Sequence, residues 1–353
     1  QRLIYIREIM FMSIIVKAQE AEVTESEENI VMKLMGYKRE NGRYGIRNHL
    51  LIIPASVCSS ETAVNIAKLV DGAIAIPHQH GCCEIGDDFD TTKRTLVGFG
   101  KNPNVGAVLV VGLGCEGIQA KDIADEIKTT GKPVEYIVIQ EEGGTAKTVS
   151  KGVEIAGKMA REISKQNKVE FDISEIILGL ECGGSDPTSG LASNPSIGVA
   201  SDMLVSMGGS SILSETTEVI GAEHLLYPRF EDENEGKKFL EMVKRVENRS
   251  IAAGHDLREG QPTPGNKAGG LTTIEEKSLG CMHKAGHSPF KGTLEYAEEL
   301  PTNKKGLYFM DTPGQDIDSI TGMVAGGAQV IVFSTGRGTP TGSPIAKSEA
   351  KRS

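Results

Sequence analysis

Short runs of apolar residues alternate along most of this chain with longer segments whose apolar residues recur every three or four positions. Runs of four to eight apolar residues are typical of buried strands, and the longer spacing is typical of amphipathic helices. The runs expected to be strands are 50–53, 73–76, 107–111, 134–139, 176–180, 211–214, 306–310 and 329–333. Because strand–helix repeats build parallel sheets covered by helices on both faces, the sequence predicts an α/β fold.

The expected helices divide the chain into two units. They are 60–69, 91–99, 118–129, 145–164, 195–207, a segment near 239–246, and 317–324. A polar break at 165–168 predicts a first α/β domain over 32–168 and a second over 169–346, each with a mainly parallel sheet. We expect residues 1–31 to be a lead-in that is either disordered or in part artificial, with the natural start at Met10 or Met12.

Composition excludes several classes of partner. The formal net charge is −10, and no tryptophan and only 5% aromatic residues are present. Nucleic acids and anionic membranes call for a basic face, so we expect neither as a partner. No apolar run approaches the roughly 18 residues that span a membrane. Six cysteines without a secretion signal predict reduced thiols in the cytoplasm.

Three cysteines stand next to glycine just beyond expected strands: Cys82, Cys115 and Cys182. The carboxyl ends of parallel strands meet at one edge of a sheet, where ligands bind in α/β folds. Thiolates suit iron, an iron–sulfur cluster or zinc better than magnesium or calcium. The pattern predicts that the three sulfurs converge on one metal site. The alternative is three unconnected structural thiols.

Further polar side chains follow other strands. The candidates for acid–base chemistry are His78, Glu116, Asp186, Glu215, Glu218 and Lys277. The candidates for binding a substrate are Arg43, Arg47, Asn48, Ser185, Arg337 and Thr339, because guanidinium groups bind carboxylates bidentately and hydroxyls bind hydroxyls. Such a lining suits a small polyhydroxylated anion. On a helical first turn, Glu215 and Glu218 would share one face and divide acid and base roles; the alternative is that both cap the following segment.

The same motifs carry a resemblance to a known family. They occur here in the order 36–48, 78–82, 112–116, 182–186, 214–218, 264–270, 311–314 and 338–344. Over about residues 32–346 the chain resembles the altronate/galactarate dehydratase family. The resemblance implies a sugar-acid hydro-lyase that uses iron (Fe²⁺ or a cluster), a dimerisation domain at 32–168, and a Rossmann-like catalytic domain at 169–346. Members acting on sulfolactate share these motifs and expel sulfite instead of water.

Three departures from the family pattern add expectations. The small β-clip domain in front of single-chain members has no counterpart here, so we expect a separate β-clip subunit as partner. The glycine that usually follows the first cysteine is Cys83, so either Cys82 or Cys83 is the ligand. The family pattern continues beyond Ala346, so the polar residues 347–353 look like the end of a truncated domain, which leaves the activity of this chain open.

Three functions follow as hypotheses. The first is a metal-dependent hydro-lyase that removes the α-proton of a sugar acid and expels its β-hydroxyl, which requires a cation or hydrogen-bond donors for the developing enediolate. The second is the large subunit of a sulfolactate sulfo-lyase. The third is a scaffold or nucleotide-binding subunit with structural thiols, although no Gly-x-Gly-x-x-Gly opens a helix in the first β-α unit and no Walker motif is present. Which sugar acid would be used stays open.

Overall fold

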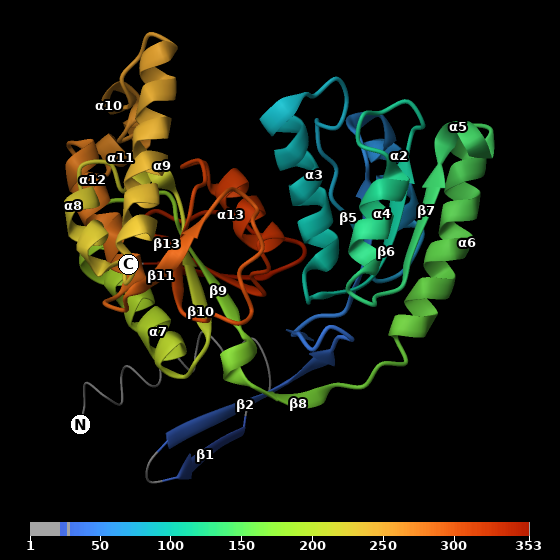
Figure 1. The fold of residues 1–353 in the computed structure, drawn as a ribbon, viewed down its shortest axis with the longest axis horizontal. Helices are drawn as coiled ribbons and strands as arrows, with labels where there is room; N and C mark the ends of the chain where they lie inside the picture. The colour runs from blue at the N-terminus through green and yellow to red at the C-terminus, as the bar shows by residue number, and fades with distance from the viewer. Residues whose placement is uncertain (1–21, 27–28, 353) are drawn as a thin grey trace.

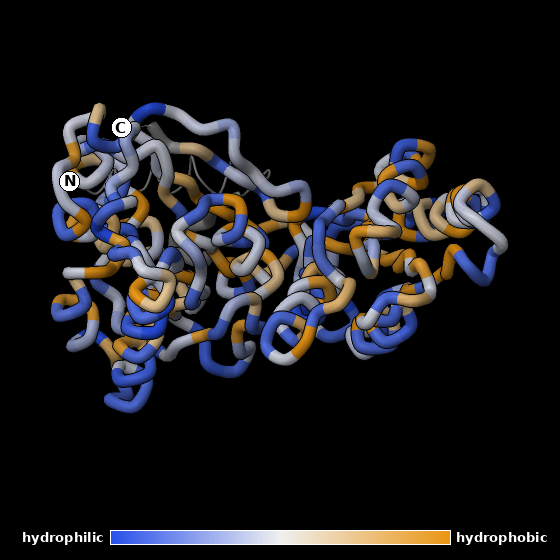
Figure 2. Tube along the Cα trace, turned by 90° about the horizontal axis from the view of Figure 1, so that it is seen from above, coloured by the Kyte–Doolittle hydropathy of each residue, from blue (hydrophilic) through white to orange (hydrophobic). Residues whose placement is uncertain are grey.

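The computed structural model describes residues 22–26 and 29–352, so the expectations for the opening residues 1–21 lie outside the described part. Two α/β bodies stand side by side above a narrow antiparallel arm (Figure 1). Figure 2 shows hydrophobic stretches inside both bodies and hydrophilic stretches on their outer turns. Both main sheets are parallel, which confirms the predicted α/β fold.

The first body has a four-stranded sheet in the order β5-β4-β6-β7. Its strands are β4 (His49–Pro54), β5 (Ala73–Ala75), β6 (Val105–Gly112) and β7 (Val134–Val138). Its helices are α2 (Val57–Lys68), α3 (Gly86–Lys101), α4 (Ala120–Lys128), the short α5 (Ile139–Glu142) and α6 (Thr145–Ile163). Side chains alternate along β4, so Leu50 packs under α2 and α6 while Leu51 packs under α3 and α4.

The second body has a six-stranded parallel sheet in the order β11-β12-β10-β9-β13-β14. Its strands are β9 (Ile177–Cys182), β10 (Ser210–Leu213), β11 (Phe290–Leu294), β12 (Leu307–Met310), β13 (Val330–Thr335) and β14 (Lys347–Arg352). Its longer helices are α7 (Asn194–Ser206), α9 (Glu233–Ala252), α12 (Ile274–Cys281) and α13 (Asp316–Ala325). Short helical segments join them: η3 (Ser189–Ser193), η4 (Thr216–Glu218), α8 (Glu223–Leu226), η5 (Tyr227–Arg229), α10 (Leu257–Gly260), α11 (Pro264–Ala268) and η6 (Met282–Ala285).

The strand order reverses direction at β9. From β9 the chain adds β10 on one side, whereas β13 and β14 lie on the other. In open parallel sheets, ligands bind in the crevice outside the carboxyl ends of the strands at such a switch point. The residues that follow β9 and β13 therefore lie where a ligand site is expected.

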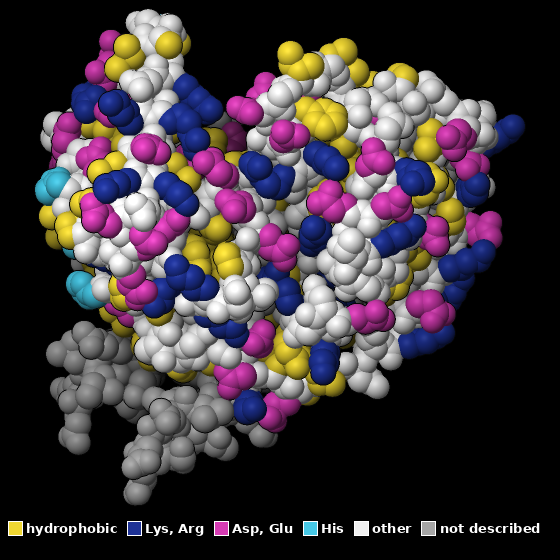
Figure 3. Space-filling view, viewed as in Figure 1, with side chains coloured by type: hydrophobic (Ala, Val, Ile, Leu, Met, Phe, Trp, Pro, Cys, Tyr) yellow, Lys and Arg dark blue, Asp and Glu magenta, His cyan; other side chains and the backbone are white. Residues whose placement is uncertain are grey.

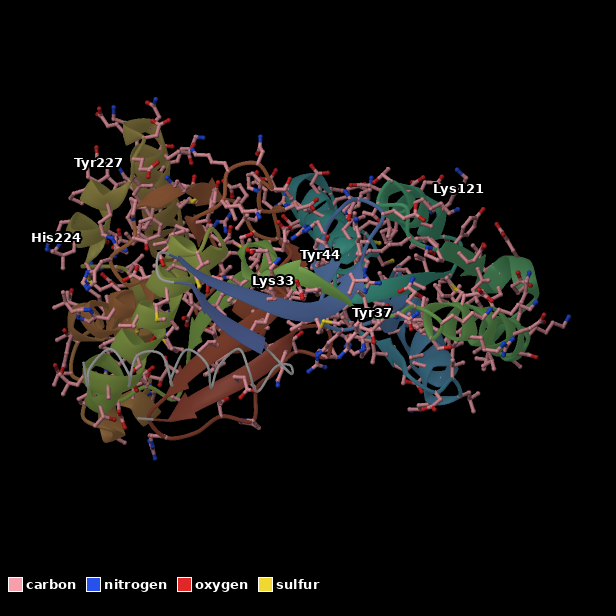
Figure 4. All side chains as sticks on the ribbon, turned by 90° about the horizontal axis from the view of Figure 1, so that it is seen from below. Lys33, Tyr37, Tyr44, Lys121, His224 and Tyr227 are labelled. Carbon is pink, nitrogen blue, oxygen red and sulfur yellow. The ribbon has the colours of Figure 1, made fainter. Side chains whose placement is uncertain are left out.

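Two parts of the fold differ from what the sequence pattern predicted: the arm and the last strand, β14. The arm is antiparallel: β1 (Glu22–Ser26), β2 (Asn29–Lys38), the two-residue β3 (Tyr44–Gly45) and β8 (Val169–Asp172). Figure 4 labels Lys33, Tyr37 and Tyr44 along it. Residues 20–30 look like a solvated lead-in because their composition is acidic, yet strand pairing with the rest of the arm orders 22–26 and 29–31. The residues expected to be a polar tail form β14 beside β13.

The surface carries charges of both signs. On the face drawn in Figure 3, Lys and Arg side chains are intermixed with Asp and Glu. None of the helices in the described part of the chain has the length and apolar character that crossing a bilayer demands.

One hydrophobic cluster contains residues of both bodies, and there α3 packs against α13. Asn104, which is fully buried, ties the bodies together through its side chain. Its amide donates to the carbonyls of Gln329 (3.0 Å) and Ile345 (3.1 Å) in the second body, and its oxygen accepts from the backbone of Ile46 (2.9 Å).

We expect Asn104→Ala to lower the free energy of unfolding by about 2–4 kcal/mol, because it leaves buried backbone groups of both bodies without partners. Urea unfolding followed by circular dichroism measures the change. The matched control is Asn167→Ala at an exposed position, expected within about 0.5 kcal/mol of wild type. Equal stability of the two variants would contradict this role of Asn104.

Candidate functional site

A polar cavity of about 310 Å³ opens at the carboxyl ends of β9 and β13. Among the residues that line it are Cys182, Ser185, Glu218, Lys277, Asp316 and Arg337. Gly183, in the turn after β9, allows the Asp316 carboxylate to approach the backbone, because a Cβ at this position would lie 2.4 Å from that carboxylate. Asp316, at the start of α13, and Cys182, at the end of β9, therefore line the same cavity.

A pair of buried thiols and a carboxylate form the floor of the site. The sulfurs of Cys182 and Cys281 lie 3.4 Å apart, and the Cys281 thiol donates to Oε2 of Glu218 at 3.2 Å. The ligand atoms of these three residues all lie within 4.8 Å of one another. Thiolate sulfurs are soft donors and a carboxylate oxygen is a hard one, so the two sulfurs are what makes this set fit iron or zinc better than magnesium or calcium.

Lys284 places a positive charge beside Cys182. Its buried ammonium donates to Cys182 Sγ (2.9 Å) and to the carboxylate of Glu215, which also accepts from the Cys182 backbone N–H (3.1 Å). The hydrogen bond from Cys281 and the charge of Lys284 lower the pKa of the Cys182 thiol to about 6, although burial opposes them. Cys281 and Lys284 thus stabilise Cys182 as a thiolate.

Burial and neighbouring charges shift the pKa values of the carboxyl groups and lysines around Cys182. Removal from water raises the pKa of Glu181 to about 8 and also raises that of Glu215, whereas the charge of Lys284, which pairs with Glu215, acts to lower both. Burial opposes the charge of Lys284, but the Cys182 thiolate and then Glu215 raise the pKa of Lys284 well above its usual value. The second lysine, Lys277, is bound to Oε1 of Glu218 at 2.6 Å, and this carboxylate raises its pKa against burial. Both lysines are therefore charged.

Glu215 and Glu218 neither share a helical face nor cap a helix. Glu215 has a φ of 67° and precedes the 3₁₀ turn η4, and its side chain makes no capping hydrogen bond. The two carboxylates point to different lysines, Glu215 to Lys284 and Glu218 to Lys277. The sequence located both residues at a strand end, but only the fold shows which cation each one binds.

The motif after β9 contributes a turn and an unpartnered hydroxyl. The carboxylate of Asp186 accepts from Thr188 (2.6 Å) and the Ser189 backbone (3.1 Å), so it holds the turn. Ser185 Oγ is buried beside the cavity and has no hydrogen-bond partner among the residues that the structure describes. Arg337 is exposed at the rim and donates to the Gly265 carbonyl at 2.8 Å. The Thr339 hydroxyl accepts from the backbone N–H of Thr341 in its own loop at 3.1 Å.

Several predicted site residues lie elsewhere. Arg43, expected to bind a substrate, instead pairs with Glu299 of the second body at 2.9 Å. Asn48 donates to the carbonyl of Ile163 at 2.9 Å. Arg47 adjoins this junction, where its carbonyl accepts from the side chain of Arg39. None of the three predicted residues is among those that line the cavity.

The predicted residues of the first body surround the carboxyl edge of its own sheet. The Glu116 carboxylate accepts from the backbone amides of Leu113 (3.0 Å) and Gly114 (2.6 Å), so it shapes a loop. The ring of His78 binds the Pro54 carbonyl at 2.8 Å, and burial lowers the pKa of His78. Cys82 and Cys115 are exposed there.

The structure does not bring the three predicted sulfurs together. Within the described residues, Cys182 groups with Cys281 and Glu218, and Cys82 and Cys115 are not members of that group. Sequence reasoning missed Cys281, Lys284 and Asp316 because the first two follow no strand and Asp316 resembles an ordinary acidic residue at a helix start. The spacing of residues along the sequence does not indicate which side chain of a helix will contact the end of a strand that is far away in the sequence.

Comparisons with known proteins agree with this architecture. Residues 36–164 match the domain described as D-galactarate dehydratase/altronate hydrolase, second domain, and residues 173–348 match D-galactarate/altronate dehydratase, C-terminal. Altronate dehydratase of Bacillus subtilis (strain 168) is 36% identical over 328 residues, which are 90% of this chain and 64% of that protein. Altronate dehydratase of Escherichia coli (strain K12) is 37% identical over 317 residues, covering 87% and 63%.

A third relative is matched over more of its length. The (2R)-sulfolactate sulfo-lyase subunit beta of Chromohalobacter salexigens is 39% identical over 315 residues, which are 88% of this chain and 79% of that subunit. By contrast, the chain spans less than two thirds of the length of the two altronate dehydratases. The domain matches and these identities together show that the chain belongs to the D-galactarate/altronate dehydratase family.

Proposed function

We propose that this chain is the catalytic part of a hydro-lyase that dehydrates a sugar acid of the altronate or galactarate type. The observation that carries the proposal is the cavity at the switch point of a parallel sheet, which is lined by Cys182, the Glu218–Lys277 ion pair and Ser185. Cys281 and Lys284 contact Cys182 from below this lining. Family membership supports the reaction class.

We assign a soft metal ion, iron in the first instance, to Cys182, Glu218 and Cys281. Their two sulfurs and one oxygen are the donor set that such an ion prefers. When bound, the ion would supply a positive charge for the substrate carboxylate and the negative charge that develops on it. Lys284 and Glu215 act as positioning residues, because they hold Cys182 in place and in its thiolate form.

The remaining residues suit the two proton transfers. Asp316 is half-buried at the cavity, and burial raises its pKa, which makes it a stronger base. We assign to it the abstraction of the α-proton. The Lys277 ammonium then gives its proton to the departing β-hydroxyl, which leaves as water, and the enol product tautomerises to a 2-oxo acid. Arg337 is placed to bind a carboxylate and Ser185 a hydroxyl.

Sulfolactate cleavage is the second candidate, favoured by the extent of the match to the beta subunit of the sulfo-lyase. Both reactions begin with removal of an α-proton. Sulfite, however, leaves as an anion and needs no proton from Lys277. In either case we propose a separate small subunit as partner, which the name of that relative supports.

The test is a panel of altronate, galactarate and sulfolactate, assayed with anaerobically purified, iron-loaded protein. Formation of a 2-oxo acid without sulfite release supports the hydro-lyase, and sulfite release supports the second candidate. If none of the three turns over and Cys182→Ser leaves the metal content unchanged, the chain is a scaffold and the proposal fails.

Lys277→Met separates the two reactions. We expect dehydration to slow by about 10²- to 10³-fold, because protonation of the leaving group by a positioned acid contributes that much. Sulfite release should slow less. The matched control is Lys267→Met, an exposed lysine on α11, which should keep wild-type turnover. Equal turnover of both variants on a sugar acid would remove Lys277 from the mechanism.

A further inference from the structure

Lys277 is held by two acceptors that reach it from different segments of the second body. Its ammonium pairs with Oε1 of Glu218 at 2.6 Å and donates to Oε1 of Gln261 at 2.8 Å. Glu218 ends the turn η4, whereas Gln261 directly follows the short helix α10. All three residues line the cavity. Gln261, which was not among the predicted site residues, therefore belongs to the same wall as the acid proposed for the leaving hydroxyl.

The two acceptors leave one donor of Lys277 for the cavity. An ammonium group has three N–H donors and no acceptor. Glu218 and Gln261 take two of them, and no other hydrogen-bond acceptor for this ammonium lies among the residues that the structure describes. Lys277 is only 7% exposed and lines the cavity, so its third N–H remains for a group that is bound there.

The contact with Lys277 also determines which way round the Gln261 amide lies. Because an ammonium can only donate, the part of the amide that faces it is the oxygen, and the amino group points to the other side. In the described part of the chain this amino group has no hydrogen-bond partner. Gln261 thus offers two further N–H donors at the cavity.

The backbone around Gln261 is fastened on both sides. Before it, the chain closes α10 with a hydrogen bond from the Gln261 N–H to the Leu257 carbonyl at 2.9 Å. After it, Thr263 caps α11, and the buried side chain of Asn266 in that helix donates to the Ser185 carbonyl at 2.9 Å. This bond ties α11 to the turn after β9. Gln261 is therefore presented by an anchored segment.

We infer that Gln261 has two roles in the loss of the β-hydroxyl: together with Glu218 it aims the third N–H of Lys277 into the cavity, and its amino group binds a hydroxyl of the substrate. The inference rests on the proposed dehydration, in which Lys277 protonates the leaving group. When the Cβ–O bond breaks, its electron pair goes to the oxygen, which takes a proton from Lys277 Nζ and leaves as water. Such a transfer requires an acid held within hydrogen-bond reach of that oxygen.

The test compares two leaving groups in the same iron-loaded protein. One substrate is the sugar acid that the protein dehydrates, and the other is its 3-chloro-3-deoxy analogue, whose chloride leaves without a proton. Gln261→Met removes the acceptor and the donors but keeps the length of the side chain. We expect kcat for dehydration to fall by about 10- to 100-fold, a part of what a positioned acid contributes, and kcat for chloride release by less than about 3-fold.

Gln261→Glu separates the two roles. An ionised carboxylate still accepts from Lys277 but has no N–H to donate. We expect kcat for dehydration to return to within about 5-fold of wild type, while KM rises by about 2- to 10-fold because a hydrogen bond to the substrate is lost. The matched control is Gln79→Met, at an exposed position of the first body, which should keep both constants. Circular dichroism and metal analysis check that each variant is folded and loaded.

The outcomes distinguish this inference from the proposed function. Wild-type dehydration by Gln261→Met would overturn the positioning role and leave the proposed function standing. Equal losses with both leaving groups, or no recovery of kcat in Gln261→Glu, would reduce Gln261 to a structural residue. An unchanged KM in Gln261→Glu would overturn the binding role. If the wild-type protein turns over neither substrate, the proposed function fails and this inference fails with it.

Discussion

Glu218→Gln is expected to lower the turnover of a sugar acid by about 10³- to 10⁴-fold, the range for losing a group that organises proton transfer. One oxygen of Glu218 holds the Lys277 ammonium at 2.6 Å, and the other accepts from Cys281 at 3.2 Å. The amide would disturb both contacts while keeping the shape of the side chain. We also expect weaker retention of metal, because the amide lacks the charge of the carboxylate.

The measurement pairs anaerobic turnover with metal analysis of the same preparation. Glu276→Gln is the matched control, because Glu276 is exposed on the helix that carries Lys277 and its carboxylate accepts from Thr272. It should retain turnover and metal. Wild-type turnover and metal content in Glu218→Gln would refute both roles assigned to Glu218.

Lys284→Met is expected to lower the free energy of unfolding by about 3–5 kcal/mol, the effect of breaking a buried ion pair. Only 1% of the Lys284 side chain is exposed. Its removal leaves the Cys182 thiolate and the Glu215 carboxylate buried together without a cation. We expect turnover to be lost as well, because Cys182 is then no longer held as a thiolate.

A double variant separates stability from activity. Lys284→Met/Glu215→Gln removes both charges, and buried pairs replaced by neutral groups often recover stability. We expect the double variant to lose about 1–3 kcal/mol less of the free energy of unfolding than the two single variants lose in sum. Its turnover should not recover. The control is Lys305→Met, whose pair with Glu175 is partly exposed and contributes about 1 kcal/mol or less. Additive losses in urea unfolding would contradict a direct Lys284–Glu215 pair.

The parallel sheets could be predicted from the sequence because their evidence is local. Each of the eight expected apolar runs lies within or overlaps a strand, from 50–53 in β4 to 329–333 in β13. A strand buried on both faces needs a continuous apolar run, and this requirement is visible in the sequence. The arm and β14 lack such runs: their order depends on pairing with distant strands, as when Leu34 pairs with Phe171.

The candidate site was partly visible for the same reason. Cys182, Glu215 and Glu218 follow strands, and strand ends of a parallel sheet meet at one edge whatever the details of packing. The sequence also located Cys82 and Cys115 at strand ends. The sequence predicted two domains with a sheet each, but it did not show how the edges of the two sheets are placed. In the structure each sheet has its own edge, and the thiols of the first body do not join Cys182.

By itself, then, the sequence determined which segments are strands and helices and which polar residues stand at strand ends. Tertiary structure decided the partners. Cys281 lies 99 residues from Cys182 and Lys284 lies 69 residues from Glu215, and they reach these partners from α12 and from the turn after it. The rotation and docking of a helix depend on the shape of the whole core, so no local pattern of residues specifies them.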